Sequence, residues 1–477
     1  MRNVTKGRSY PELWNSIWNA ILPLREAFSR EITFMWFATA VVGMLVRTEV
    51  LGVTSIVRAL NLKPGYYDPL VKFFQSRAVK LDKLAVLWAH AVLRLFTNPV
   101  RFNDRLVLVG DGIKIPKSGK QMPAVKLMHQ QSNHSTKPEY IMGHSLQAVA
   151  VLVNAASSFF AVPLAARIHE GVVWSNRDKR TVLDKMLGLL KLLVIKEKYY
   201  FVADAYYAAG KMINGLLKQD NHLVTRVKSN AVAYLPAPPR CGGNVRGRPR
   251  IYGDRLPVRS LLDQFKLMQA ARINLYGDNS VDILFNTRDL MWRPAGRLVR
   301  FVAVVYPGRG AILLMSTDLT LSAVDIIKIY SLRFKIEHMF KQAIHVLGTF
   351  SYHFWMKNMK PRDSRSKNQY LHRDPDEYRE KVRSKIHAYH LFMQVGLIAQ
   401  GLLQYLSVEM PDLVWNSFGS WLRTIRPGIP PSELVVGNVM RNTIAEFLLN
   451  CGKGHPLAKF IAKRQDFERM RIFRLVS

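Results

Sequence analysis

The sequence contains little cysteine. Its 477 residues include two, Cys241 and Cys451, which by themselves form neither a disulfide framework nor a zinc site. The N-terminal stretch "MRNVTKGRSYPELW" also lacks the apolar core of a secretory signal. Both features are typical of a protein in a reducing cytosol, and we expect a cytoplasmic location.

Long hydrophobic runs are scarce as well. Residues 32–46 are uncharged over only 15 positions, which is too short to cross a bilayer and predicts a buried helix. Residues 146–166 hold no charge over 21 positions, but Asn154 and Pro163 are among the residues that interrupt the run. We expect two buried strands joined by "NAASS" there, and no membrane-spanning segment.

Acidic residues are heavily outnumbered. The chain has 34 Asp and Glu against 69 Lys and Arg, which gives a formal net charge of +35. Hydrophobic residues make up 49% of the chain, so a sizeable core is available and global disorder is not expected. A basic excess of this size favours a polyanionic partner, with nucleic acid as the default expectation. A generically basic protein without such a partner is the plain alternative.

The pattern of the chain changes from helical to mixed near residue 100. Leu13, Trp14, Ile17 and Trp18 recur at helical spacing, and residues 81–96 repeat that pattern. The elements predicted next are a strand at 105–115, two strands within 146–166, a helix at 180–197, a strand at 199–204, a helix at 205–219 and a strand at 222–228. This order favours an antiparallel meander of three strands, followed by crossovers to parallel strands.

The second half of the chain has a different texture. Residues 230–320 contain many Gly and Pro and short alternating apolar runs, which predicts a β-rich segment without a clear helix. Residues 319–348 predict one long helix, with Ser322 and Asp325 suiting a capping box and Gly348 ending it. Residues 356–385 are charged and contain Pro, as in an exposed loop or an extended basic arm. Further helices follow, the last over residues 457–475.

Three carboxylates stand at informative places in this pattern. Asp111 closes the first predicted strand, Asp204 closes the fourth, and Glu337 lies within the long predicted helix. In a sheet of the predicted order the first and fourth strands are neighbours, so both aspartates emerge at one edge. Oxygen ligands of this kind suit a pair of hard cations about 4 Å apart, which serve phosphoryl transfer. Each acid taken alone is equally explained as a cap or turn residue.

The predicted helix places four functional side chains on one face. Tyr330, Arg333, Glu337 and Lys341 are spaced at −7, −4, 0 and +4 relative to the glutamate. This pattern is either an ordinary ladder of salt bridges or a metal-binding Glu337 flanked by cations that hold DNA phosphates, with Tyr330 donating a hydrogen bond.

These residues carry a resemblance to a known family. The chain resembles the DDE transposases of bacterial insertion sequences, in particular the insertion-sequence-four-like group, whose third acid lies in a Tyr-x-x-Arg-x-x-x-Glu-x-x-x-x-x-x-Lys signature. Tyr330, Arg333 and Glu337 match it, whereas the last position holds Ile344, and Lys341 lies one turn earlier on the same face. The stretches "VGDGIKIP", "VADAYYA" and "LVTRVKSNAVAY" also resemble strand motifs of the family. The spacings fit too, at 204 − 111 = 93 and 337 − 204 = 133 residues.

The resemblance implies a fold and a domain arrangement. The expected class is α/β, a ribonuclease-H-like mixed sheet flanked by helices, with a β-rich insertion and helical N- and C-terminal regions. The expected parts are a helical DNA-binding region at 1–100, the first part of the catalytic core at 101–229, the insertion at 230–320, the second part of the core at 321–405 and a helical basic region at 406–477.

The resemblance also implies an activity. Asp111, Asp204 and Glu337 would bind two Mg²⁺ ions, for which Mn²⁺ substitutes, and no nucleotide cofactor is expected. The partners implied are double-stranded DNA, both the terminal repeats of the element and the target, with a homodimer bridging two DNA ends. The location implied is the bacterial cytoplasm, at the nucleoid.

Further residues are candidates for DNA contacts. Arg226 and Lys228 alternate on a predicted strand and therefore share one face, as phosphate contacts or simply as a solvated face. Trp292 is either a platform for a flipped base or part of the insertion's own core. The arginines of "NVRGRPRIYG" either clamp the end of the element or lie in a plain exposed turn. Those arginines are Arg246, Arg248 and Arg250.

Two other functions compete with a transposase. One is a ribonuclease-H-like nuclease that cuts without strand transfer, and the other is a non-catalytic DNA-binding protein derived from a transposase. The β-rich insertion and the Tyr-Arg-Glu helix argue against the first, and the presence of all three acids argues against the second.

Overall fold

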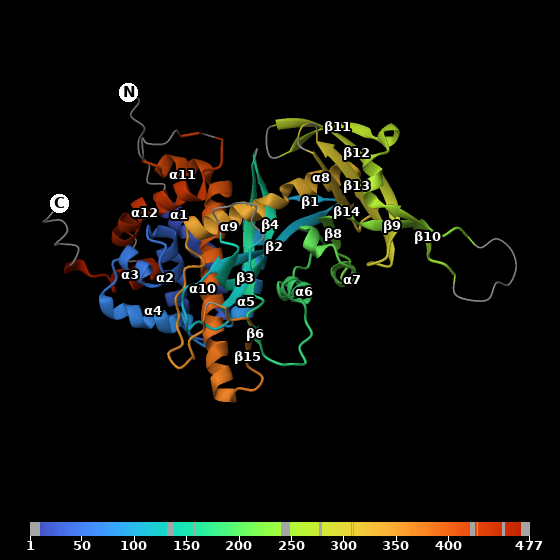
Figure 1. Ribbon diagram of the computed structural model, residues 1–477. Coiled ribbons are helices and arrows are strands. Elements are labelled where there is room, and N and C mark those ends of the chain that lie inside the picture. The colour runs from blue at the N-terminus through green and yellow to red at the C-terminus, as the bar shows by residue number, and fades with distance from the viewer. Residues whose placement is uncertain are drawn as a thin grey trace, which may run out of the picture.

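The structure, a computed structural model, describes residues 10–130, 138–156, 158–239, 249–275, 279–306, 308, 310–363, 365–419, 425–426, 428–450 and 454–468 (Figure 1). Its α-helices are α1 (Tyr10–Ile21), α2 (Glu31–Val46), α3 (Thr54–Ala59), α4 (Tyr67–Phe74), α5 (Leu81–Leu95), α6 (Val182–Leu192), α7 (Gly210–Leu217), α8 (Ala323–Ser331), α9 (Lys335–His345), α10 (Asp376–Glu409), α11 (Pro411–Ser417), α12 (Glu433–Asn450) and α13 (Pro456–Ala462). Short 3-10 helices are η1 (Leu22–Ala27), η2 (Pro64–Tyr66), η3 (Ala205–Tyr207), η4 (Val258–Leu262), η5 (Phe265–Leu267) and η6 (Leu332–Phe334).

Within these residues, thirteen strands form one mixed sheet in the order β10-β9-β12-β13-β14-β8-β7-β2-β4-β3, with β1 beside β2, β5 beside β4 and β11 beside β12. The strands are β1 (Arg101–Phe102), β2 (Arg105–Pro116), β3 (Lys126–His129), β4 (Tyr140–Ala155), β5 (Ser158–Ile168), β7 (Tyr199–Ala203), β8 (His222–Arg226), β9 (Val232–Pro236), β10 (Tyr252–Pro257), β11 (Gln269–Leu275), β12 (Asn279–Trp292), β13 (Arg297–Tyr306) and β14 (Gly310–Ser316). A separate pair joins β6 (Val172–Val173) to β15 (Gln369–Tyr370).

The central strands have the ribonuclease-H-like arrangement. Strands β5, β4 and β2 form an antiparallel meander, and β7 and β8 then add in parallel beside β2. Helices α6 and α7 are the crossovers to those parallel strands. The predicted order of strands and helices is therefore confirmed, as is the mixed α/β class. The uncharged run at 146–166 is likewise two strands, with Pro163 tolerated on β5 beside a register shift.

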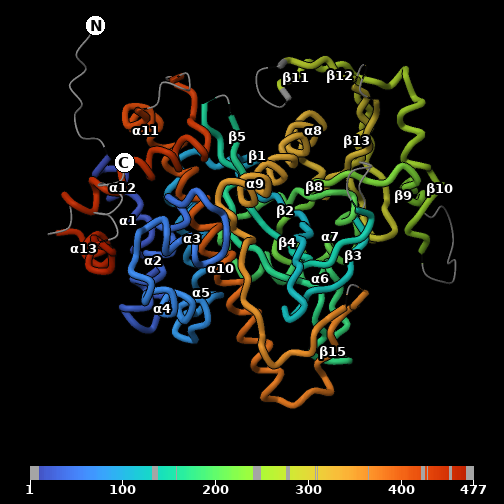
Figure 2. Tube along the Cα trace, turned by 60° about the vertical axis from the view of Figure 1, so that its left-hand side comes forward, coloured from blue at the N-terminus to red at the C-terminus, as the bar shows by residue number. Residues whose placement is uncertain are grey.

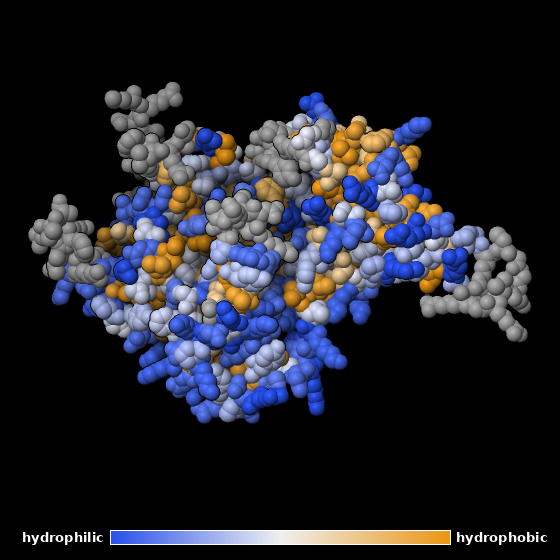
Figure 3. Space-filling view, in the orientation of Figure 1, coloured by the Kyte–Doolittle hydropathy of each residue, from blue (hydrophilic) through white to orange (hydrophobic). Residues whose placement is uncertain are grey.

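The β-rich insertion extends this sheet. Strand β14 pairs with β8 antiparallel, and β13 and β12 follow outward, so the described strands between residues 232 and 316 continue the central sheet. As predicted, the described part of this segment contains strands and only short 3-10 helices. It also exposes apolar side chains, among them Phe265 and Leu267, and hydrophobic surface gathers over this part of the molecule in Figure 3 (upper right).

The longest helix, α10, runs through the centre of the molecule (Figure 1). It contacts β5 of the sheet and the helices α2, α5 and α12. By length and composition alone it could cross a membrane, but 89% of its apolar window is buried inside the protein. Its apolar surface is thus covered by the chain itself, as in a core helix. The 15-residue run in α2 is buried in the same way.

The two ends of the chain pack together. Trp14 of α1 stacks on Phe447 of α12 at 4.8 Å, and its indole Nε1 donates a hydrogen bond to Thr443 Oγ1 at 3.1 Å. Figure 2 shows the blue N-terminal helices beside the red C-terminal ones. The helical regions expected at 1–100 and 406–477 therefore share one apolar core, and the boundary expected at 405 falls within α10.

Two predictions about the C-terminal half are wrong. Residues 356–385 are not a free arm, because α10 begins at Asp376 and the preceding stretch buries Met356, Met359 and Leu371 in a small core of their own. The last helix was expected over 457–475, but α13 ends at Ala462, and Gln465 then forms a bridge with Leu62; residues 469–475 of the expected helix lie outside the described residues.

A buried arginine ties the N-terminal helices to the end of α9. Arg47 is 2% exposed and donates hydrogen bonds to the carbonyls of Gly52, Leu347 and Gly348. Gly348 has a φ of +59°, and a Cβ there would lie 2.9 Å from Arg47 Nη2, so only glycine fits. The predicted stop at Gly348 is thus present just beyond the helix.

We expect Arg47→Met to lower the free energy of unfolding by about 3 kcal/mol, since two buried carbonyls lose their donor. Urea denaturation measures the change. The matched control is Arg58→Met, because Arg58 forms an exposed ion pair with Glu49 at 2.9 Å and should contribute about 1 kcal/mol or less. Equal effects of the two changes would contradict this role of Arg47.

Candidate active site

Asp111 lies within β2, where the strand loses its parallel neighbour. Pairing between β2 and β7 ends at Val109, whereas pairing with β4 continues to Pro116. The expectation that Asp111 stands at the end of its strand is therefore wrong, because β4 supports the strand beyond it. The backbone N–H of Gly112 donates a hydrogen bond to Asp111 Oδ1 at 2.7 Å.

Asp204 directly follows β7, at the same level of the sheet as Asp111. Each aspartate comes two residues after the paired Val109 and Val202, and neighbouring strands are about 4.8 Å apart. Asp204 also caps η3, since its Oδ1 accepts a hydrogen bond from the N–H of Tyr206 at 3.0 Å. The predicted meeting of the two aspartates at one edge thus follows from the register of β2 and β7.

Glu337 lies in the first turn of α9 and is joined to Asp111 through Arg333. One guanidinium nitrogen of Arg333 lies 2.6 Å from Glu337 Oε1, and the other lies 3.2 Å from Asp111 Oδ2. The Arg333 side chain is only 18% exposed, whereas that of Glu337 is 57% exposed. The predicted i,i+4 contact is present, and the arginine additionally bridges the helix to the sheet.

The single long helix expected over 319–348 is interrupted. Helix α8 ends at Ser331, the 3-10 turn η6 follows, and α9 begins at Lys335. The Ser331 hydroxyl donates a hydrogen bond to the carbonyl of Lys328 at 2.7 Å, a local bond that bends helices. Ser322 does cap α8 with its hydroxyl, which accepts from the N–H of Asp325 at 3.0 Å, as predicted.

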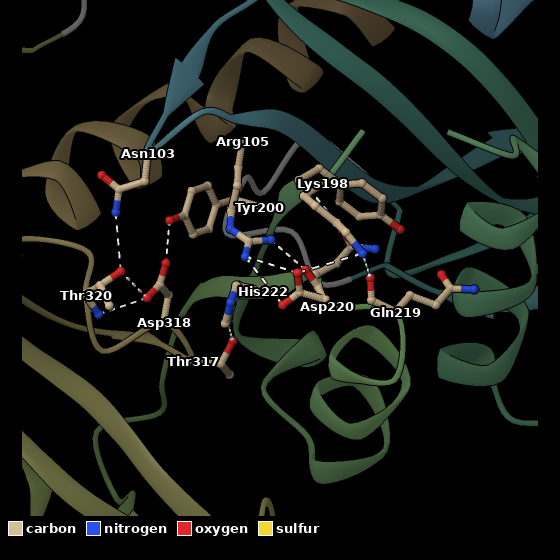
Figure 4. Close-up of polar contacts among 12 residues, drawn as sticks. Asn103, Arg105, Lys198, Tyr200, Gln219, Asp220, His222, Thr317, Asp318 and Thr320 are labelled. Atoms are coloured by element: carbon tan, nitrogen blue, oxygen red, sulfur yellow. Dashed lines mark hydrogen bonds and ion pairs between the residues drawn. The ribbon is translucent and has the colours of Figure 1, made fainter. Parts of the chain in front are cut away.

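A polar network at the opposite edge of the sheet anchors the start of α8 (Figure 4). The hydroxyl of Tyr200 donates to Asp318 Oδ2 at 2.5 Å, and the N–H and hydroxyl of Thr320 donate to Asp318 Oδ1. Arg105 beside it donates to the carbonyl of Asp220 at 2.5 Å. The turn that leads from β14 into α8 is therefore fixed to the central strands, and with it the helix pair that carries Arg333 and Glu337.

Burial and neighbouring charges change the proton affinity of Asp111. Burial and then the charge of Asp204 raise the pKa of Asp111 to about 6, while Arg333 lowers it and Glu337 raises it. Burial raises the pKa of the Tyr330 hydroxyl, with Asp204 adding to the rise and Arg333 opposing it. These mutual influences place the three acids, the arginine and the tyrosine in one electrostatic neighbourhood.

Two residues of this neighbourhood have no counterpart in the sequence-based predictions. Burial raises the pKa of Tyr207, and the charges of Asp111 and Asp204 raise it further. Its hydroxyl accepts a hydrogen bond from Gln147 Nε2 at 3.2 Å. Gln147 is 1% exposed and pairs with Gly112 across β2 and β4. The sequence feature that points to Gln147 is its lone amide in the otherwise apolar run "LQAVAVLV".

The predicted basic contacts are partly assembled here. Arg226 and Lys228 are both exposed with Val227 buried between them, as the alternation predicted, and the charge of Arg226 acts on Tyr330. Lys341 is exposed on α9, beyond Glu337. Arg250 is exposed just before β10, whereas Arg246 and Arg248 lie outside the described residues.

Trp292 is part of the core of the insertion. Its side chain is 6% exposed, and its ring meets that of Phe301 at 6.5 Å in an edge-on arrangement. Because the indole is covered, the structure favours the packing interpretation over a stacking platform.

The acids suit a hard divalent cation in their chemistry. Within the described residues, no three His, Cys, Asp or Glu side chains stand close enough to form a ready-made metal cage. Arg333 instead lies between Asp111 and Glu337. Carboxylate oxygens are nevertheless the ligands that such cations prefer, and the raised pKa of Asp111 reflects its burial first and the negative charge of Asp204 second. A bound cation and the guanidinium would compete for the same oxygens.

The match to a protein family agrees with this chemistry. A family model described as DDE superfamily endonuclease matches residues 23–273, which include Asp111 and Asp204 and end before Glu337. The structure is also similar to the cryo-EM structure of the piggyBac transposase synaptic complex with hairpin DNA, at 9% sequence identity and a TM-score of 0.37, covering 93% of this chain and 84% of that chain. A search of curated proteins finds no match.

We expect Asp111→Asn to stabilise the metal-free protein at neutral pH. The pKa of Asp111 is raised from 3.8 to about 6, so its ionised form costs stability as the pH rises through that range. The substitution should raise the free energy of unfolding by up to about 3 kcal/mol at pH 7.5 and leave it unchanged at pH 4. Urea denaturation in EDTA at both pH values measures this.

The control is Asp289→Asn, which breaks the two-bond ion pair with Arg300 at 2.8 Å and should destabilise the protein. A loss of stability in Asp111→Asn at pH 7.5 would contradict the repulsion inferred among the acids.

Proposed function

The chain belongs to the DDE superfamily of endonucleases, and on that premise we propose that it is the transposase of a bacterial insertion sequence. It binds the ends of its element, cleaves phosphodiester bonds there and transfers the freed 3′-OH ends to target DNA. The observation that supports this most is that Arg333 joins Asp111 to Glu337, while the charge of Asp204 acts on Asp111. The match of Tyr330, Arg333 and Glu337 to the signature supports a place in the insertion-sequence-four-like group.

Divalent metal would be held by the three acids. We propose that Asp111, Asp204 and Glu337 bind Mg²⁺, for which Mn²⁺ substitutes. When bound, a pair of such ions supplies the activation of the attacking oxygen and neutralises charge on the phosphate. The half-exposed Glu337 side chain gives an incoming ion access from solvent, while the more enclosed Asp111 holds the sheet side of the site.

The chain's own cations and hydroxyls would position the DNA. Arg333 is charged at any working pH and lies between Asp111 and Glu337, so it is placed to hold a phosphate oxygen beside them. Tyr330, on the same helix pair, would donate a hydrogen bond from its hydroxyl to a DNA phosphate. Arg226 and Lys228 present two exposed cations at the end of β8, next to Tyr330.

More distant contacts would extend the DNA path. We propose phosphate contacts for Lys341 and for the arginines of "NVRGRPRIYG", namely Arg246, Arg248 and Arg250. The buried Trp292 supports a packing role, so we assign it no contact with a base. The net charge of +35 supports double-stranded DNA as the partner, both element ends and target. Two copies of the chain would bridge two element ends.

We expect Asp111→Asn, Asp204→Asn and Glu337→Gln each to reduce Mg²⁺-dependent cleavage of an element-end duplex by at least about 100-fold. Each substitution replaces an anionic ligand with a neutral side chain of nearly the same shape. Binding of the duplex should persist. Gel analysis of cleaved and joined oligonucleotides measures both steps, and EDTA should abolish them.

Glu446→Gln is the matched control, because Glu446 is an exposed helical glutamate on α12 and its loss should leave cleavage unchanged. Cleavage that survives any of the three acid substitutions would refute the assignment. Cleavage by the wild type without any joined product would instead identify a nuclease without strand transfer.

The double variant Arg226→Gln/Lys228→Gln should weaken duplex binding and lower its dependence on salt. Each phosphate contact contributes about 0.9 to the slope of log K against log salt, so the slope should fall by about 2. Fluorescence anisotropy at several KCl concentrations measures it. Arg94→Gln/Lys191→Gln, which neutralises two exposed cations on α5 and α6, serves as control. An unchanged slope in Arg226→Gln/Lys228→Gln would show that these two side chains are solvated and do not contact phosphates.

A further inference from the structure

Trp355 is an aromatic side chain held out into solvent. It is 63% exposed, and it is the only exposed tryptophan in the part of the chain that the structure describes. Burial alternates along this segment, because Tyr352, Phe354 and Met356 are buried whereas Trp355 is exposed. A single exposed apolar residue is ordinary, so the surroundings of the indole decide its meaning.

The indole forms a ridge between two hollows. One hollow has a volume of 740 Å³ and the other of 370 Å³, and both are lined by Gln75, Trp355 and Lys385. The larger also takes in Arg77 and Lys357 from the two sides. Trp355 therefore borders two spaces, in either of which a flat ligand can lie.

The charge around this ridge is positive. The two acids at the larger hollow are already paired, Glu377 with Lys381 at 2.6 Å and Glu380 with Arg77 at 2.8 Å. The described residues provide no ion-pair partner for Lys357 or Lys385. Burial lowers the pKa of Lys385, so an anionic group arriving beside it would favour its charged form.

The segment that carries Trp355 is held in place on both sides. Tyr389 donates a hydrogen bond to the carbonyl of Phe354 at 2.7 Å, and the N–H of Met356 donates to the carbonyl of Gln121 at 2.9 Å. Upstream, the buried Lys117 donates to the carbonyls of Phe350 and Tyr352. The indole is thus presented in a fixed position, which reduces the entropy lost when a ligand stacks on it.

We propose that Trp355 is a stacking platform for an unpaired DNA base, with Lys357 and Lys385 holding the flanking phosphates. An aromatic face among cations is the chemistry by which proteins hold single-stranded nucleic acid. The proposal deepens the proposed function by adding a second DNA contact to it. The segment that carries Trp355 is bound by Lys117, which follows directly after β2. The part of β2 from Asp111 to Pro116 spans about 16 Å, so we place the Trp355 contact apart from the proposed cleavage site.

Binding of a fluorescein-labelled 12-nucleotide single strand to the full-length protein in EDTA tests the proposal. Trp355→Ala should weaken binding at least about five-fold, whereas Trp355→Phe should stay within about two-fold of the wild type. Lys357→Gln/Lys385→Gln should lower the salt slope by about 1.4, at about 0.7 for each phosphate. Phe265→Ala, which removes a 75% exposed ring from the insertion, is the matched control and should change nothing.

A photo-crosslink locates the contact directly. A strand carrying 5-iodouracil should crosslink to the tryptic peptide that ends at Lys357 in the wild type, and Trp355→Ala should abolish that crosslink. Wild-type affinity in Trp355→Ala, with the same thermal unfolding midpoint, would overturn the proposal and point to a protein partner for the ridge.

The two proposals fail separately. If the wild type cleaves duplex ends but Trp355→Ala binds the single strand unchanged, the platform is refuted and the transposase stands. If the wild type cleaves nothing but Trp355→Ala loses the single strand, the platform stands and the transposase is refuted.

Discussion

One guanidinium organises the candidate site. Three carboxylates approach one another at an edge of the sheet, and their mutual repulsion together with burial raises the pKa of Asp111 to about 6. Arg333 offsets this cost because it reaches Asp111 on β2 and Glu337 on α9 at once. A buried charge of either sign is expensive alone, so the arginine and the acids require one another. Their ion pairs join the helix to the sheet at the level where the chemistry is proposed.

The position of Arg333 depends in turn on contacts far from it in sequence. The Tyr200–Asp318 hydrogen bond fixes the turn before α8, and Arg47 holds the carbonyls of Leu347 and Gly348 after α9. Between these anchors, the Ser331 hydroxyl bends the helix into two pieces. Groups from the N-terminal helices, the central strands and the helix itself therefore combine to aim a single side chain.

Much of this arrangement could be predicted from the sequence, since buried strands and caps leave local patterns. The parallel pairing of β2 with β7 follows from element order, and Asp204 closes its strand as predicted. The break at Ser331 depends on one hydroxyl that binds a backbone carbonyl of the helix. The spacing of apolar residues does not reveal such a bond. The first turns of α10 are charged, and most of its buried residues lie in the later turns, so the sequence pattern predicts a loop where the helix begins. Tyr207 and Gln147 join the site through register across strands, which composition does not encode.

Long-range pairing also decides which aromatic residues of the insertion and its surroundings are exposed. Trp292 is covered because β12 pairs with β13 and brings Phe301 to it, whereas Trp355 is left outside a stretch whose other rings are buried. Since β14 pairs directly with β8, the insertion and the strand that carries Arg226 belong to one continuous sheet. The described strands of the insertion are therefore an extension of the central sheet. Within the insertion, β9 meets β12 through the single pair of Tyr234 and Met291, so the strand pair β9 and β10, which begins just after Arg250, joins the rest of the insertion through that pairing.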